Sequence, residues 1–225
     1  MIQAVLFDMD GVLFNTERLY SKALPAITKE LGYPMDMAFF VRTLGISSRE
    51  CRRLYEEVYG DGFPFDTVAG RLFDFILDYS QKHTMPLKDG VMDCLSALRS
   101  RGLTPVVATS SPRFVVDTLF SALPELNRMF LGKVCGDEVT QGKPDPEIYQ
   151  KAAALAGFPP AECLGVEDSP SGLMAIRAAG AYAVMVPDLL PYTEALKPYA
   201  NSVIASLRGL PALIDTLNAP QLNHK

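Results

Sequence analysis

The chain has 225 residues, 48% of them hydrophobic, so it is long enough for one large domain or for one domain that carries an insertion. Its formal net charge of −5 at pH 7 argues against a nucleic-acid-binding surface, because such surfaces gather lysine and arginine on one face. No apolar run approaches the roughly 20 residues of a membrane-spanning helix, and residues 1–10 lack the basic-then-apolar layout of a signal peptide. The cysteines are far apart and show no Cys-x-x-Cys spacing, which predicts a reducing, cytoplasmic location; they are Cys51, Cys94, Cys135 and Cys163.

Short apolar segments of strand length recur along the chain. In order, they occupy residues 4–7, 104–109, 131–135, 163–166 and 181–186. Helix-length stretches separate the segments after the first. This alternation predicts an α/β fold, a doubly wound parallel sheet with helices on both faces.

One interval interrupts the alternation. Residues 18–31, 48–59 and 68–81 have the 3.6-residue periodicity of helices, and no convincing strand lies between residue 7 and residue 104. A structureless loop of about ninety residues is improbable in a compact domain, so we predict an inserted helical domain there. The predicted boundaries are 1–14 and 87–225 for the α/β core, with a helix at 92–101 stopped by Gly102, and 15–86 for the insertion. Residues 218–225 have the composition of a polar tail.

Two acidic residues follow the first predicted strand. Asp8 and Asp10 are two positions apart, so their side chains leave an extended backbone on the same side. Two anions this close repel each other and need a cation or a shared proton. Taken alone, this Asp-Met-Asp-Gly stretch is more typical of a turn than of a catalytic site.

Three further polar groups follow or adjoin later apolar segments. They are Thr109-Ser110-Ser111, Lys143-Pro144-Asp145 and Glu167-Asp168-Ser169. Each alone has a simpler interpretation, since the hydroxyl residues could cap helices that begin at the following prolines and Lys143-Pro144 could be a loop. The carboxyl ends of parallel strands meet at one edge of a sheet, however, so we expect all four groups to converge there.

These four motifs, in this order, resemble those of the haloacid-dehalogenase-like phosphohydrolases. The similarity is to the branch that includes β-phosphoglucomutase and small sugar phosphatases, and it extends over essentially the whole chain. It implies a Mg²⁺-dependent phosphatase that hydrolyses a small phosphorylated metabolite, such as a sugar phosphate, through an aspartyl-phosphate intermediate. It also implies that the helical insertion is a cap that closes over the site and excludes water.

The resemblance assigns a role to each motif. Asp8 would be the nucleophile, and Asp10 would be the general acid for the leaving group and then the base for water. Lys143 would neutralise Asp8 and the phosphoryl oxygens, to which Thr109 and the Ser110 N–H would also bond.

The same resemblance supplies a ligand set for Mg²⁺. The expected protein ligands are Asp8, the Asp10 carbonyl and Asp168, with Glu167 either a direct ligand or a residue behind the ligands. Zinc is excluded, because the only histidines are His83 and His224.

Substrate choice in this family lies largely in the cap. The segment 44–49 could enter the mouth of the site, although Ser47 or Ser48 could instead cap a helix. The candidate substrate-binding residues are Gly11, Thr16, Tyr20, Gly45, Ser47, Arg49, Ser110, Ser111 and Arg113.

The sequence departs from the phosphoglucomutase pattern at two positions. Leu44 stands where a lysine usually precedes the cap glycine, and Tyr20 stands where that pattern has histidine. Losing a cation there weakens the grip on a second phosphate, which favours a monophosphatase over a mutase. Arg49 and Arg113 are possible substitutes for the missing cation.

Three other functions compete with the phosphatase. A phosphorylatable Mg²⁺-binding signalling receiver has no place for the helical insertion, a metal-free dehalogenase would not need Asp10 or Asp168, and an inactive scaffold would show substituted catalytic positions. We therefore expect a small phosphorylated metabolite as the partner, no nucleic acid or membrane, and a monomer or weak homodimer.

Overall fold

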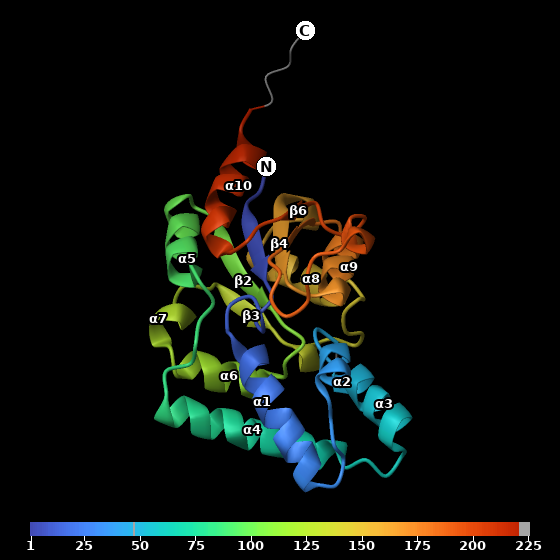
Figure 1. Ribbon diagram of the computed structural model, residues 1–225. Coiled ribbons are helices and arrows are strands. Elements are labelled where there is room, and N and C mark those ends of the chain that lie inside the picture. Colours follow the sequence, from blue (N-terminus) through green and yellow to red (C-terminus); the bar gives the residue numbers. More distant parts are fainter. Residues whose placement is uncertain (47, 221–225) are drawn as a thin grey trace.

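The computed structural model describes residues 1–46 and 48–220. Its sheet has six parallel strands in the order β3-β2-β1-β4-β5-β6 (Figure 1). The five predicted strands are confirmed to within one residue at each end. The sixth, β6, was not predicted, because two residues are too short to show periodicity. The strands are β1 (Ala4–Phe7), β2 (Thr104–Ala108), β3 (Gly132–Val134), β4 (Cys163–Glu167), β5 (Tyr182–Met185) and β6 (Ser202–Val203).

The sheet is covered by helices on both faces, as predicted for a doubly wound fold. Along β1, Val5 and Phe7 pack into one hydrophobic core while Ala4 and Leu6 pack into the other, because successive side chains of a strand point to opposite faces. The first core is closed by α5 (Val91–Ser100), α6 (Arg113–Ser121), α7 (Pro124–Asn127) and α10 (Leu210–Asn218). The second core is closed by α8 (Glu147–Ala156) and α9 (Pro170–Ala179).

The helical insertion consists of α1 (Thr16–Glu30), α2 (Met37–Arg42), α3 (Ser48–Tyr59) and α4 (Phe65–Lys82). These helices lie together at the end of the sheet where β1 ends (Figure 1). They share a third core, in which Phe40 and Tyr55 are almost completely buried. The short helix α2, which was not predicted, begins where the Asp36 carboxylate accepts a hydrogen bond of 2.7 Å from the Phe39 N–H.

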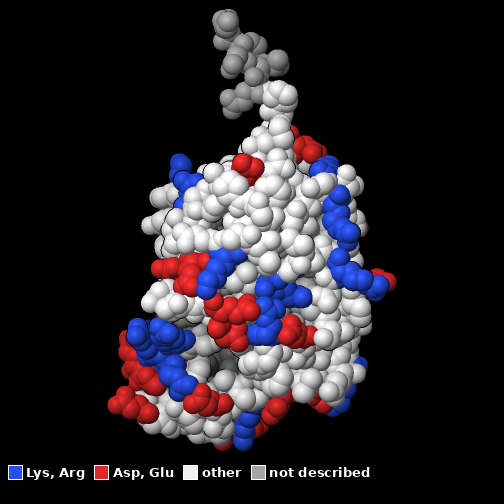
Figure 2. Space-filling view, turned by 180° about the vertical axis from the view of Figure 1, so that it is seen from behind, with Lys and Arg blue, Asp and Glu red and all other residues white. Residues whose placement is uncertain are grey.

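The remaining features of the fold are the distribution of charge on its surface and the short turns between its elements. On the face shown in Figure 2, acidic and basic side chains are interspersed rather than separated. Among residues 1–46 and 48–220, no helix is both long enough and apolar enough to cross a bilayer. Within the described part of the chain, four 3₁₀ turns join the larger elements: Gly136–Glu138, Pro160–Glu162, Glu194–Leu196 and Leu207–Gly209.

The strand order reverses at β1, which pairs with β2 on one side and with β4 on the other. Phe7 lies beside Val107 and Val166 in this register. The residues that follow these three therefore emerge at one edge of the sheet, and this switch point is where open α/β sheets bind their ligands.

Candidate active site

A buried lysine joins the first and last acidic motifs. The Lys143 ammonium donates hydrogen bonds of 2.6 Å to Asp8 Oδ1 and 2.6 Å to Glu167 Oε1, and a third of 3.2 Å to the Ala108 carbonyl. Only 1% of Lys143 is exposed. Burial opposes the charge of Lys143, but the two carboxylates outweigh it and raise the pKa of the lysine. The residues predicted to converge at this edge therefore meet around a permanent positive charge.

Glu167 is held by donors on both of its oxygens. Oε1 accepts from Lys143 and from the Tyr149 hydroxyl at 2.9 Å. Oε2 accepts from the backbone N–H groups of Asp168 and Ser169 and from the Ser169 hydroxyl. A carboxylate has about four lone-pair positions, so these five donors leave no free position for a metal. Although Glu167 lies within the acidic cluster, its hydrogen bonding favours the second of the two predicted alternatives, a residue behind the metal ligands.

Asp10 lies in a ring of hydroxyl groups. Its Oδ1 accepts from Thr16 and, at 3.4 Å, from Tyr20, while its Oδ2 accepts from Ser111 at 2.8 Å. Burial raises the pKa of Asp10, and the bonds from Thr16 and Ser111 oppose this shift in part. Asp10 can therefore carry a proton at a higher pH than an ordinary aspartate.

The hydroxyl loop after β2 faces the acids instead of capping the next helix. The Thr109 hydroxyl accepts a 3.1 Å bond from the Ser111 N–H, and α6 begins after Pro112 without a side-chain cap. The simpler interpretation is correct for Ser169, which caps α9 by accepting from the Gly172 N–H at 3.1 Å.

The acidic residues fit a divalent cation. Carboxylate oxygens of Asp8 and Asp168 lie within 4.8 Å of each other and of a Glu167 oxygen, so Asp8 and Asp168 can share an ion that Glu167 does not bind. Gly11 has φ +80°, and a Cβ there would collide with the Asp168 carboxylate, so only glycine allows the two to approach. Burial, followed by neighbouring carboxylates, raises the pKa of Asp168. A divalent cation would relieve that repulsion, and oxygen-only donors of this kind suit Mg²⁺.

A second acidic group adjoins the first and shares Asp168. Glu17, Asp168 and Asp188 also have carboxylate oxygens within 4.8 Å of one another. Glu17 Oε2 and Asp188 Oδ2 are buried and have no hydrogen-bond partner. Burial and the nearby Asp10 raise the pKa of Glu17 to about 8. The other Asp188 oxygen pairs with Lys88 at 2.7 Å, so the two unpartnered oxygens are the positions left for a cation or a proton.

Sequence reasoning missed Glu17, Tyr149 and Asp188. Glu17 lies in the first turn of α1, where an acidic residue is normally read as a favourable partner of the helix dipole. Its position seven residues after Asp10, on the helix that leaves the site, was the only available signal. Tyr149 and Asp188 follow no motif that marks them.

A cavity opens above the acids, between the core and the helical insertion. Of the predicted substrate-binding residues, it is lined by Tyr20, Gly45, Ser110 and Ser111, as well as by Asp8, Asp10 and Thr109. Gly45 also contacts the core, because its carbonyl accepts a 2.6 Å bond from the Ser171 hydroxyl. Ser47 lies outside the described residues.

The structure does not bring two predicted cations to this cavity. The Arg113 guanidinium turns away to Glu138, at 2.7 Å, and to the Lys133 carbonyl, at 2.9 Å. Arg49 is exposed and is not among the described lining residues. Thr16 is also outside the lining, because it is buried beneath the cavity against Asp10. The structure therefore places none of these three side chains in the lining of the cavity.

Comparison with known proteins gives the family. A family model for haloacid dehalogenase-like hydrolases matches residues 2–180. A Drosophila melanogaster protein named "Probable pseudouridine-5'-phosphatase" is 33% identical over 93% of this chain and 95% of its own length. A Thermotoga maritima protein named "Phosphorylated carbohydrates phosphatase" is 32% identical over 80% of this chain and 82% of its own. The chain therefore belongs to the haloacid dehalogenase-like hydrolases and is an enzyme.

A solved structure agrees with this assignment. CbbY from Rhodobacter sphaeroides in complex with phosphate superimposes with a TM-score of 0.79, at 25% identity, over 93% of this chain and 96% of that one. The similarity covers the sheet and the helical insertion together, so it confirms the predicted fold class.

Proposed function

We propose that this enzyme is a Mg²⁺-dependent phosphatase that transfers the phosphoryl group of a small phosphomonoester to Asp8 and then to water. The observation that carries the proposal is the contact between Asp8 and Lys143 inside a group of carboxylates that lie within 4.8 Å of one another. The names of the two relatives, both phosphatases of small metabolites, support it.

The residues divide the reaction into two steps. An Asp8 carboxylate oxygen attacks phosphorus while Asp10 gives its proton to the departing alcohol oxygen, which leaves a phosphorylated Asp8 and an ionised Asp10. Asp10 then accepts a proton from the water that attacks phosphorus, so that inorganic phosphate is released and both aspartates return to their first state. Lys143 and the backbone of the Thr109–Ser111 loop hold the phosphoryl oxygens.

The same group of residues would bind the metal ion. Asp8, Asp168 and the Asp10 carbonyl would hold Mg²⁺. Glu167 would lie behind these ligands and orient the Lys143 ammonium through their hydrogen bond. Bound there, the ion would supply positive charge to the equatorial oxygens of the transferring group.

The helical insertion has the position of a cap. The two segments that join it to the core pair with each other: the Asn15 N–H donates to Pro86 O at 2.8 Å, and the Lys88 N–H donates to Leu13 O at 2.9 Å. We propose residues 15–86 as the cap and 1–14 with 87–225 as the core. We also propose a cytoplasmic location, because the four cysteines are free thiols and a reducing compartment keeps thiols in that form. For the oligomeric state we propose a monomer or weak homodimer.

A mutase is not favoured. A mutase must bind a second phosphate, and none of the described residues that line the cavity is lysine or arginine. Arg49 and Arg113, the two possible substitutes, lie elsewhere.

The proposal is tested with purified protein and p-nitrophenyl phosphate. We expect turnover that requires Mg²⁺ and that is abolished in Asp8→Asn while the circular dichroism spectrum is unchanged. Unchanged turnover in excess EDTA would contradict the proposed site.

A further inference from the structure

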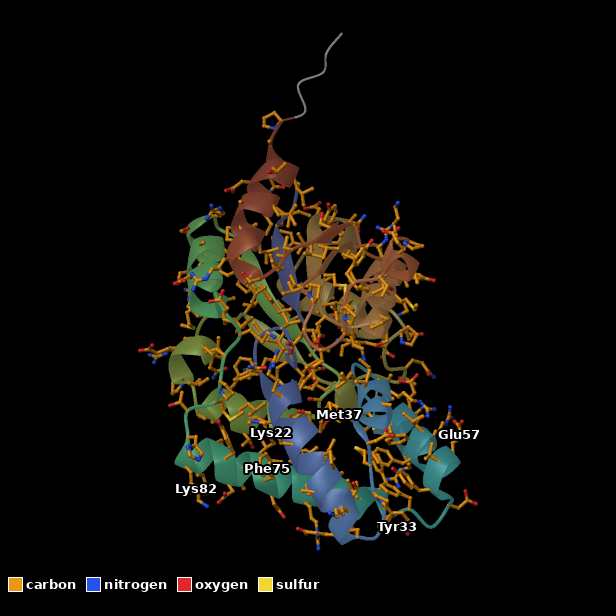
Figure 3. The ribbon with its side chains drawn as sticks, viewed as in Figure 1. Lys22, Tyr33, Met37, Glu57, Phe75 and Lys82 are labelled. Atoms are coloured by element: carbon orange, nitrogen blue, oxygen red, sulfur yellow. The ribbon has the colours of Figure 1, made fainter. Side chains whose placement is uncertain are left out.

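The shape of the cavity shows where the alcohol part of a substrate would lie. The cavity has a volume of about 260 Å³ and extends from Asp8, Asp10 and Thr109 into the helical insertion. Helices α1 and α4, which carry the labelled Lys22 and Phe75 in Figure 3, form one side, and the packed side chains of α2 and α3 form the other. With the phosphate at the aspartates, the alcohol must enter this space.

The wall supplied by the insertion is apolar. Leu24, Phe40, Leu72 and Ile76 contribute to it from three different helices. At the boundary with the core, the ring of Phe73 on α4 meets the ring of Phe114 on α6 edge to face, with centroids 4.7 Å apart. Phe114, which is 53% exposed, also lines the cavity.

The charges in the cavity are all negative. Among the described lining residues, only Asp8, Asp10 and Glu17 are charged. The nearby Arg52 is held outside by Asp66 and by the face of the Phe65 ring. A substrate with a second anionic group would bury that charge without a partner, which is costly.

Among its described residues, the insertion contributes six polar side chains to the lining, and two of their hydroxyl groups are already engaged; the six are Glu17, Tyr20, Thr43, Ser48, Cys51 and Tyr55. The Tyr20 hydroxyl is directed to Asp10, and the Thr43 hydroxyl donates to the Phe40 carbonyl at 2.7 Å. Burial raises the pKa of the Cys51 thiol to about 12, so the thiol stays neutral and donates weakly. Most of the other insertion residues that line the cavity are apolar, so a polyhydroxylated group would find few partners there, and each hydroxyl group left unpaired would cost free energy.

We infer that the alcohol part of the substrate is apolar, about the size of one substituted ring, and carries no second anionic group. The inference rests on the proposed phosphatase function and selects, among the small phosphomonoesters expected from the sequence, those with an apolar alcohol part. The size agrees with that of known apolar cavities, because a cavity of about 150 Å³ lined by leucine, isoleucine and phenylalanine binds benzene. This cavity is larger, and the phosphate beside Asp8 and Thr109 takes up part of it.

The test uses two phosphates that differ only in polarity. Cyclohexylmethyl phosphate and glucose 6-phosphate both join a six-membered ring through a CH₂ group to the phosphate, so their leaving alcohols have similar size and reactivity. We expect kcat/KM to be at least about tenfold higher for cyclohexylmethyl phosphate, the ratio that one or two buried methylenes supply. We expect 4-carboxybenzyl phosphate to be at least about tenfold poorer than benzyl phosphate.

A substitution in the cavity wall tests whether this wall causes the preference for cyclohexylmethyl phosphate. Leu72→Asn places an amide of similar shape in the wall, and we expect it to reduce the preference for cyclohexylmethyl phosphate about tenfold. Leu155→Asn is the matched control, because Leu155 is 43% exposed on α8, outside the cavity lining, and should leave the preference unchanged. Equal or faster turnover of glucose 6-phosphate would overturn the inference and leave the phosphatase proposal intact. No turnover of any of the four phosphates would overturn both.

Discussion

Lys143 Nζ lies 2.6 Å from Asp8 Oδ1 although 135 residues separate them in the chain, and the pair is almost completely buried. A buried charge that loses its partner is strongly destabilising. The contact therefore contributes to the fold as well as to the proposed chemistry, and a substitution at Lys143 should change both.

Lys143→Met should lower the free energy of unfolding by about 3–5 kcal/mol, because it leaves Asp8 and Glu167 buried without their cation. Turnover should be lost as well. Denaturant titration measures the first effect. Lys151→Met is the control, since Lys151 pairs with Glu147 at the surface, where such a pair contributes about 0–1 kcal/mol. Similar stability losses in both variants would argue against the buried pair.

Asp10→Asn should separate the two steps. The p-nitrophenolate group leaves without a proton, so a burst of product equal to the enzyme concentration should remain. Hydrolysis of the phosphoryl-enzyme should slow by about 10²–10⁴-fold, because the base for water is gone. Stopped-flow absorbance measures both phases. A burst that disappears while steady turnover persists would exclude Asp10 from these roles.

Metal removal should make stability fall as pH rises. The pKa of Glu17 is about 8 in the folded protein and near 4.5 in the unfolded chain. Between these values the folded, metal-free protein binds more protons than the unfolded chain, so the free energy of unfolding decreases with pH. The raised pKa values of Asp8, Asp10 and Asp168 act in the same direction.

Thermal denaturation in EDTA between pH 5 and pH 8 checks this expectation. The melting temperature should fall with pH, and Mg²⁺ should restore it most at pH 8. Glu17→Gln should flatten the pH dependence in EDTA and weaken Mg²⁺ binding measured by calorimetry. A melting temperature in EDTA that rises from pH 5 to pH 8 would contradict the interpretation of this pocket.

Gly45→Ala should impair turnover more than stability. Gly45 has φ +68°, and a Cβ there would collide with the Ser169 side chain, so the insertion would be displaced from the core. Gly32→Ala is a matched control, because Gly32 has φ +88° and nothing within 4 Å of its Cβ position. Both variants should lose about 1–2 kcal/mol from backbone strain. Only Gly45→Ala should lose activity, and an equal loss in Gly32→Ala would show that strain alone is responsible.

The sequence predicts best the residues that the sheet positions directly. Asp8, Thr109 and Glu167 each end or follow a strand, so strand periodicity and parallel topology are enough to bring them together. Lys143 lies in a loop, and only its place in the order of motifs indicated its position. The doubly wound core was predictable for the same reason.

Side-chain direction on helices was not predictable. Arg113 lies two residues after Ser111 of the hydroxyl loop, yet its guanidinium turns to Glu138, because that carboxylate accepts two of its hydrogen bonds. Glu17 lies in the first turn of α1 and reaches the site only because that helix packs against the core. The apolar wall of the cavity likewise depends on how four separate helices meet, which no local pattern encodes.

The central claim is that Asp8 receives the phosphoryl group. A single turnover with enzyme in excess over p-nitrophenyl phosphate, stopped in acid and followed by peptide mass spectrometry, tests it most directly. We predict that the mass of one phosphoryl group appears on the peptide that contains Asp8 and maps to that residue. A phosphoryl group on any other residue would contradict the account.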